Sequence, residues 1–142
     1  MIAKAKSEDF AQILAIISEN QSNQFAWNEN NFKQEFLLNS TFTNSIDGEI
    51  VSFAVVADRG EVIELTVLGT KKSRQQQGRM KELIKWLINA YSQKSEIWLE
   101  VHELNTSAIK LYLSLGFKEV GRRPKYYQDT RSAIMLSFKM GS

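Results

Sequence analysis

An acid and a phenol occur close together in a segment rich in apolar side chains. The segment is WLEVHELNTSAIKLYLSLGF, residues 98–117, with Glu100 in its first part and Tyr112 in its second. A carboxylate can take a proton from an attacking group, and a phenol can give a proton to a leaving group. The pair therefore has the residue types of a general base and a general acid.

The pattern of the segment predicts how these two side chains are held. Side chains alternate along a strand, so Glu100 shares a face with Trp98 and His102, opposite an aliphatic face. The second part has the i, i+3, i+4, i+7 spacing of one helical face, on Ala108, Leu111, Tyr112 and Leu115. A short turn joins this strand to the helix that follows it. We therefore expect both groups to reach the carboxyl end of the strand, where open α/β sheets bind ligands.

Each of these residues also has an interpretation without chemistry. Glu100 could be a solvated acid on a half-exposed strand, and Tyr112 could be an ordinary core aromatic. A functional carboxylate would be partly buried, because burial disfavours the charged form and so strengthens the base. His102 could carry protons for Glu100, although a single histidine near a strand end is more often a surface residue.

The loop RQQQGRMKEL, residues 74–83, is a second candidate site. Gly78 lets the backbone approach a ligand, and the free amides of a first helical turn attract anions together with the helix dipole. Positive charge surrounds the loop, on Lys71, Lys72, Arg74, Arg79 and Lys81. A solvated polar loop is the alternative, since neither a Walker lysine motif nor G-x-G-x-x-G is present.

Composition excludes several classes of site. The 142 residues contain no cysteine and one histidine, which excludes disulfides, thiolate zinc sites, a thiol nucleophile and a His-rich metal site. A net charge of +2 is too small to indicate a protein dedicated to nucleic acid. No signal peptide or membrane span is apparent. We expect a cytoplasmic protein without a membrane partner.

The elements that must hold these groups follow from hydrophobic periodicity. We expect a strand at 2–5, a helix capped by Ser7, and a shorter helix capped by Asn28 with an apolar stripe of Phe32, Phe36 and Leu37. Three antiparallel strands should follow over 41–68, with turns at 47–48 and 58–60.

A helix after Gly78 should present Leu83, Ile84, Leu87, Ile88 and Tyr91 on one face. The strand and helix of the first motif follow, Gly116 ends that helix, and two strands flank Pro124. The order is β-α-α-β-β-β-α-β-α-β-β. It predicts an α/β fold, α+β in some schemes, with a mixed, mostly antiparallel seven-stranded sheet and helices on both faces. We expect one domain over 1–140, with Gly141-Ser142 as a candidate cloning remnant.

The element order, the Q-x-x-G loop of residues 75–78 and NTSAIKLYLSLGF together resemble the GNAT superfamily of acetyl-CoA-dependent N-acetyltransferases. Residues 98–117 are similar to its RimI type, which acetylates the N-terminal amine of a ribosomal protein. FAWNENNF, residues 25–32, and RRPKYY, residues 122–127, resemble two further segments of that type.

The resemblance implies a role for each matching residue. Glu100 would be the general base and Tyr112 the general acid, with Asn105 as a cofactor contact. The strand residues Leu65, Thr66 and Val67 would hold the acetyl and pantetheine parts of acetyl-CoA. The pyrophosphate would lie on Gln75, Gln76, Gln77, Gly78, Arg79, Met80 and Lys81. The acceptor would contact Trp27, Tyr126 and Tyr127. No metal is implied.

The sequence departs from this type at three places. Met80 stands where the family has a small residue, which predicts weaker cofactor binding. The stretch 67–78 is longer than usual. Arg131 and Ser132 replace acidic residues, which makes a protein N-terminus less favoured as acceptor. Three alternatives stay open: a small-molecule amine acetyltransferase, a CoA-binding module with little turnover, and an RNA-contacting accessory domain using residues 71–79.

Overall fold

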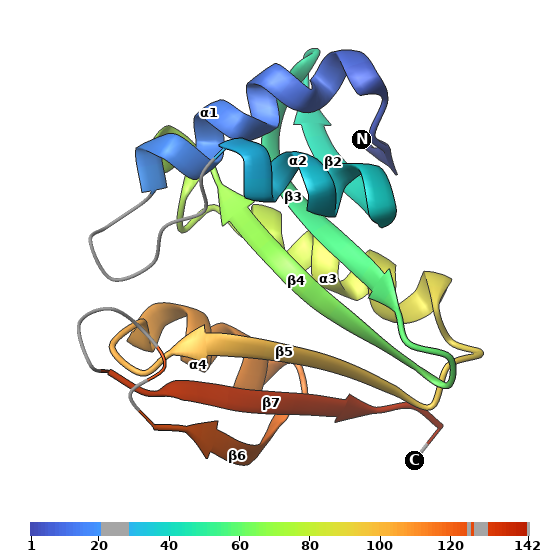
Figure 1. Ribbon diagram of the computed structural model, residues 1–142, viewed down its shortest axis with the longest axis vertical. Coiled ribbons are helices and arrows are strands. Elements are labelled where there is room, and N and C mark those ends of the chain that lie inside the picture. Colours follow the sequence, from blue (N-terminus) through green and yellow to red (C-terminus); the bar gives the residue numbers. More distant parts are fainter. Residues whose placement is uncertain (21–28, 125, 127–130, 142) are drawn as a thin grey trace.

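The computed structural model describes residues 1–20, 29–124, 126 and 131–141. One seven-stranded sheet runs through the molecule in the order β1-β2-β3-β4-β5-β7-β6 (Figure 1). Among the described strands, β4 and β5 form the one parallel pair, and their neighbours pair antiparallel. The strands are β1 Ile2–Lys4, β2 Ser40–Ile46, β3 Glu49–Asp58, β4 Val62–Thr70, β5 Glu96–His102, β6 Lys118–Arg123 and β7 Ala133–Lys139. The predicted mixed sheet and element order are confirmed.

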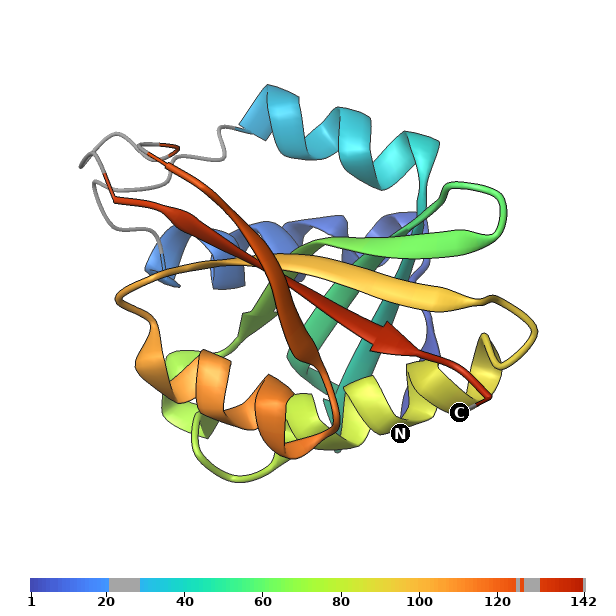
Figure 2. The same cartoon turned by 90° about the horizontal axis from the view of Figure 1, so that it is seen from below.

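Helices cover both faces of the sheet, as predicted, with α1 and α2 on one face and α3 and α4 on the other (Figure 2). Short 3-10 turns, η1 and η2, precede α1 and α3. The bounds are η1 Ser7–Asp9, α1 Phe10–Asn20, α2 Glu29–Leu38, η2 Lys72–Arg74, α3 Arg79–Ala90 and α4 Thr106–Ser114.

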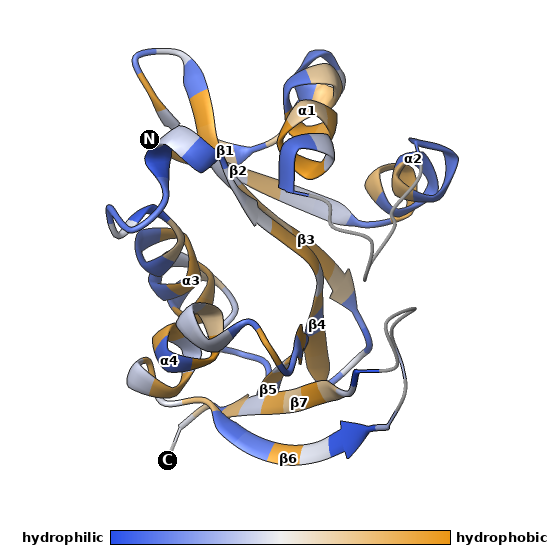
Figure 3. Cartoon of the chain, turned by 90° about the vertical axis from the view of Figure 1, so that its left-hand side faces the viewer, coloured by the Kyte–Doolittle hydropathy of each residue, from blue (hydrophilic) through white to orange (hydrophobic). Residues whose placement is uncertain are grey.

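Strand β3 lies between two hydrophobic clusters and is buried on both faces (Figure 3). Phe53 and Val55 pack with the apolar stripes of α1 and α2, whereas Ala54 and Val56 pack with those of α3 and α4. Because strand side chains alternate, one strand can serve two cores. The result is a rigid centre from which the neighbouring strand β4 extends.

Two local expectations at the helices are wrong. Ser7 is not the cap of α1: the helix is preceded by η1, where the Asp9 carboxylate accepts a hydrogen bond from the Lys6 N–H at 2.8 Å. Leu37 does not join the apolar stripe of α2, because its side chain is 70% exposed. The proposed cap Asn28 lies outside the described residues.

The parallel pairing of β4 with β5 stops partway along both strands. Paired positions run from Val62 opposite Glu96 to Leu65 opposite Leu99, although β4 continues to Thr70 and β5 to His102. Figure 1 shows the two strands meeting at one end and spreading apart at the other.

A bulge in β4 lies where the two strands separate. Val56 of β3 pairs with Leu65, but the preceding residue, Val55, pairs with Val67. Thr66 is therefore the extra residue. A β-bulge bends a strand and strengthens its twist, which accounts for β4 turning away from β5 at this point.

Within the described part of the chain, no helix is both long and apolar enough to cross a membrane.

Candidate active site

A cleft of about 770 Å³ lies where β4 and β5 separate. Its walls come from β4, the loop after it, the first turn of α3, the end of β5 and one side of α4. Most predicted cofactor residues line it: Leu65, Thr66, Val67, Gln75, Gln76, Gly78, Arg79, Met80, Lys81 and Asn105. Gln77 does not. The two motifs found in the sequence thus meet at a single concave site.

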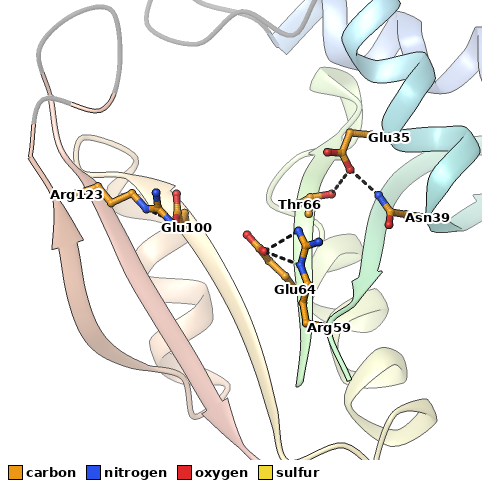
Figure 4. A network of polar contacts seen from close by, with 7 residues as sticks. All are labelled: Glu35, Asn39, Arg59, Glu64, Thr66, Glu100 and Arg123. Carbon is orange, nitrogen blue, oxygen red and sulfur yellow. Dashed lines mark hydrogen bonds and ion pairs between the residues drawn. The ribbon is translucent and has the colours of Figure 1, made fainter. Parts of the chain in front are cut away.

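Glu100 lies on β5 with its side chain 18% exposed, facing the side of the sheet covered by α1 and α2. The predicted alternation is confirmed, since Leu99 and Val101 are buried on the opposite side. The carboxylate forms an ion pair with Arg123 of β6, with 2.6 Å between Nε and Oε1 (Figure 4). No spacing in the sequence indicates this partner, because β7 lies between β5 and β6 in the sheet.

Tyr112 is 5% exposed on α4 and packs in the core cluster with Leu99 and Val101. Its ring centroid lies 5.8 Å from that of Phe117. Burial raises the pKa of Tyr112, because the charged phenolate is disfavoured away from water. No described residue is hydrogen-bonded to its hydroxyl, and the residue lines the cleft. The phenol is therefore neutral, and its hydroxyl is not engaged by another described residue.

The bulged residue Thr66 is tied to α2. Its Oγ1 donates to Glu35 Oε2 at 3.1 Å, and the same oxygen accepts from Asn39 Nδ2 at 2.7 Å (Figure 4). The bond from Thr66 links α2 to the part of β4 that lines the cleft, and the bond from Asn39 holds the Glu35 carboxylate in place. The link joins residues that are distant in sequence, so no spacing could have indicated it.

The loop before α3 is anchored by the end of α1. Gln75 Nε2 donates to Asn20 Oδ1 at 2.8 Å and to the Thr70 carbonyl at 3.3 Å. The N–H of Lys72 donates to Glu19 Oε1 at 2.8 Å. The longer connection noted in the sequence is therefore an ordered part of the cleft wall.

Helix α3 starts without a side-chain cap. Gly78 occupies the cap position with a φ of 78° in the left-handed region, which glycine adopts without strain. The N–H of Glu82 bonds the Gly78 carbonyl at 3.0 Å, and the residues that precede it in the first turn, Arg79 to Lys81, line the cleft. Such a turn is suited to bind an anion such as a pyrophosphate.

The cations around this turn are only partly available to a ligand. Lys71 and Arg74 both pair with Glu49, each at 3.4 Å, and these two partners lower the pKa of that carboxyl, with the Lys71 hydrogen bond as the largest cause. Arg79 pairs with Glu82 at 2.8 Å. Lys81 lines the cleft and forms no ion pair with the described residues.

Met80 lines the cleft at this turn and also packs, partly buried, against the core cluster of α3 and α4. The side chain thus has an apolar contact that draws it away from the open end of the helix. Its bulk still borders the place where a phosphate would approach the backbone.

Asn105 is the cap of α4, with its Oδ1 accepting from the Ala108 N–H at 3.3 Å. His102 accepts a hydrogen bond at Nδ1 from the Leu104 N–H at 3.0 Å, which fixes the imidazole in the turn after β5. Both residues line the cleft. The cap explains why α4 begins where it does and why Tyr112 falls on its inner face.

A second group of charged residues faces Glu100 across the opening between β4 and β5 (Figure 4). Glu64 of β4 pairs with Arg59 at 3.1 Å.

Tyr126, expected at the acceptor site, is 49% exposed and lies beneath the Arg123 guanidinium, 5.6 Å from ring centroid to Cζ. Trp27 and Tyr127, expected to contact the acceptor, lie outside the described residues.

The described residues contain no group of three or more histidine, cysteine, aspartate or glutamate side chains that could hold a metal ion. The titratable side chains that line the cleft include Glu100, Tyr112, His102 and Lys81.

Comparison with known proteins supports the similarity seen in the sequence. Residues 7–117 match the acetyltransferase (GNAT) family. The ribosomal protein bS18-alanine N-acetyltransferase of Escherichia coli (strain K12) is 33% identical over 120 residues, covering 79% of this chain and 78% of that protein. The enzyme of the same name from Haemophilus ducreyi (strain 35000HP) is 32% identical over 133 residues, covering 89% and 88%.

The fold is also shared with a solved structure. The crystal structure of the ribosomal-protein-S18-alanine N-acetyltransferase from Escherichia coli superposes with a TM-score of 0.91 at 26% identity, covering 100% of this chain and 94% of that one.

Proposed function

This chain belongs to the acetyltransferase (GNAT) family of acetyl-CoA-dependent N-acetyltransferases, and from that premise we propose that it acetylates a protein N-terminal amine. The observation that carries the mechanism is that Glu100 and Tyr112 line one cleft at the end of β5. The relatives named for bS18 alanine support the acceptor class.

The cleft has the features needed for acetyl-CoA. The uncapped first turn of α3, with Gly78 at its start, would hold the pyrophosphate through backbone N–H groups. The β4 residues Leu65 to Val67 would run beside the pantetheine, where β4 has left β5 and its edge is open. When bound, acetyl-CoA supplies an activated acetyl thioester. The side chain of Gln75 holds the loop in place through its bonds to Asn20 and to the Thr70 carbonyl.

Glu100 would act as the base. An α-amine has a pKa of about 8, so much of it is protonated at neutral pH and must lose a proton before it attacks. A carboxylate at the acceptor side of the cleft can take that proton, directly or through water, once Arg123 has moved from it.

Tyr112 would act as the acid. The raised pKa of its phenol keeps the proton in place at neutral pH, and the hydroxyl has no partner among the described residues. The phenol can then protonate the sulfur as the thiol departs. A backbone N–H near Val67 would stabilise charge on the carbonyl oxygen.

The acceptor class depends on the charge of the residues at the acceptor side of the cleft. Arg131, which stands where acidic residues are usual, pairs with Glu103 at 3.7 Å, so its charge is partly compensated. This reduces the repulsion that it would exert on a cationic N-terminus. A protein N-terminus therefore stays compatible with the site.

The test measures binding and turnover separately. Acetyl-CoA should raise the unfolding temperature of the protein, since a ligand at ~100 times its Kd adds about 2.7 kcal/mol to the free energy of unfolding. Thiol release should then be faster with short peptides bearing a free N-terminus than with small amines. Thiol release with small amines alone would mean that the acceptor is a small amine and not a protein N-terminus. Binding of acetyl-CoA without thiol release would indicate a CoA-binding module.

A further inference from the structure

The base assigned under the proposed function already has a cationic partner. Arg123 Nε lies 2.6 Å from Glu100 Oε1, a short charge-assisted contact. The Arg123 backbone is opposite Ala133 on β7, and Glu100 is opposite Met135 of the same strand. The arginine side chain thus crosses β7 to reach the carboxylate.

The amine acceptor needs the same place. It arrives as an ammonium, a cationic hydrogen-bond donor that must come within hydrogen-bond reach of Glu100 to lose its proton. Because the Glu100 side chain is only 18% exposed, a guanidinium on its Oε1 leaves little room for an ammonium at the same carboxylate.

We propose that Arg123 occupies the ammonium position of the acceptor in the free enzyme, and that the acceptor must displace it. The inference rests on the proposed function. Arg123 would act as an internal competitor that sets acceptor affinity, and not as a catalytic residue.

Two observations indicate that Arg123 can leave. Its side chain is 55% exposed, so the guanidinium stays partly hydrated while it pairs, which lowers the free-energy cost of separating it from Glu100. The same guanidinium lies over the ring of Tyr126, 5.6 Å from its centroid, which offers the cation a second partner when Glu100 is taken.

The competition has a defined kinetic signature. An acceptor binds only the fraction of enzyme in which Glu100 is not paired with Arg123. Its apparent Kd is therefore its intrinsic Kd divided by that fraction. Removing the guanidinium should lower the KM of every amine acceptor by one common factor, roughly two- to fivefold for a pair of this exposure. The kcat and the KM of acetyl-CoA should stay unchanged.

Arg122→Gln is the matched control for Arg123→Gln. Arg122 is the neighbouring residue on β6 but pairs with Glu119 at 3.2 Å and with Glu103 at 3.9 Å, away from Glu100. We expect its loss to leave the KM of the amine unaltered. Thermal unfolding of both variants would show whether the fold is kept.

The closing experiment adds guanidinium chloride at millimolar concentration to Arg123→Ala. The free guanidinium ion should compete with the amine and return its KM toward the parent value, with less effect on the parent itself, which a structural role for Arg123 would not produce. The parent enzyme can be active while its Arg123 variants show an unchanged or raised amine KM, or an amine KM that guanidinium does not change. Either result overturns this inference and leaves the proposed function intact. A parent without acetyl transfer overturns the proposed function and this inference with it.

Discussion

Glu100 and Tyr112 lie on opposite faces of β5 and yet line one cleft. Glu100 faces the side of α1 and α2, while Tyr112 packs with Leu99 and Val101 on the side of α3 and α4. Both reach the cleft because β4 leaves β5 after Leu65, which opens the sheet between the two faces. Under the proposed function, the amine approaches from one face and the thiol departs toward the other.

Replacing the base should stop turnover without loss of the fold. Glu100→Gln keeps the size of the side chain but cannot accept the proton of an ammonium, so we expect kcat to fall at least roughly tenfold. Thiol release and acetyl-CoA binding are the two measurements. Glu119→Gln is the control, because Glu119 pairs with Arg122 on β6 and does not line the cleft. If both variants had the same kcat, Glu100 would not be the base of the reaction.

Tyr112→Phe should separate chemistry from packing. The ring contact with Phe117 is retained, so we expect a folded protein that binds acetyl-CoA with unchanged affinity. Loss of the proton donor should lower kcat at least roughly tenfold. The measurement is the kcat and the acetyl-CoA KM at saturating amine. An unchanged kcat would show that the thiol leaves without this phenol.

Tyr112 should also make stability depend on pH in the alkaline range. Its pKa is raised in the folded state, so above about pH 10 the unfolded chain loses a proton that the folded chain keeps. Below that pH the phenol makes its full contribution to the free energy of unfolding. As the pH rises above it, this contribution falls by up to about 1.4 kcal/mol per pH unit. Chemical denaturation from pH 8 to 11 should show the parent losing stability faster than Tyr112→Phe, and parallel curves would contradict this.

The sequence predicted the elements well because each has its own local periodicity. The alternation in 97–102 correctly placed Glu100 opposite Leu99, and the spacing in α4 correctly placed Tyr112 inward. The first hairpin turn was also predicted: Asp47 and Gly48 have φ of 49° and 81°, as a tight hairpin turn requires.

The contacts that complete the site were not predictable in the same way. The Glu100 pair with Arg123 depends on sheet order, in which β7 lies between β5 and β6. The bond between Thr66 and Glu35 depends on a bulge and on the packing of α2. Such contacts join distant segments, and one sequence carries no periodic signal for them.

Met80→Ala should improve cofactor affinity at a cost in stability. A smaller side chain leaves more room for a phosphate beside the first turn of α3, so we expect a lower Kd for CoA. Met80 also packs partly buried against the core, and losing part of that apolar contact should cost about 1 kcal/mol. Calorimetric titration with CoA and denaturant unfolding measure the two effects. A Kd that rises would show that Met80 supports the ligand rather than crowding it.

Gly69 of β4 should not tolerate a side chain. A Cβ built there would lie 2.7 Å from the Phe53 ring and 3.3 Å from Ile16, and both neighbours are held in the core. Overpacking of this kind typically costs about 1–3 kcal/mol, so Gly69→Ala should lower the free energy of unfolding by that amount. It should also disturb acetyl-CoA binding, because Gly69 lines the cleft. Gly121→Ala is the control, since its Cβ would make an ordinary contact of 3.5 Å with the Met135 sulfur. Urea unfolding curves for the two variants should differ clearly, and coincident midpoints would mean that the Phe53 ring moves aside at little cost.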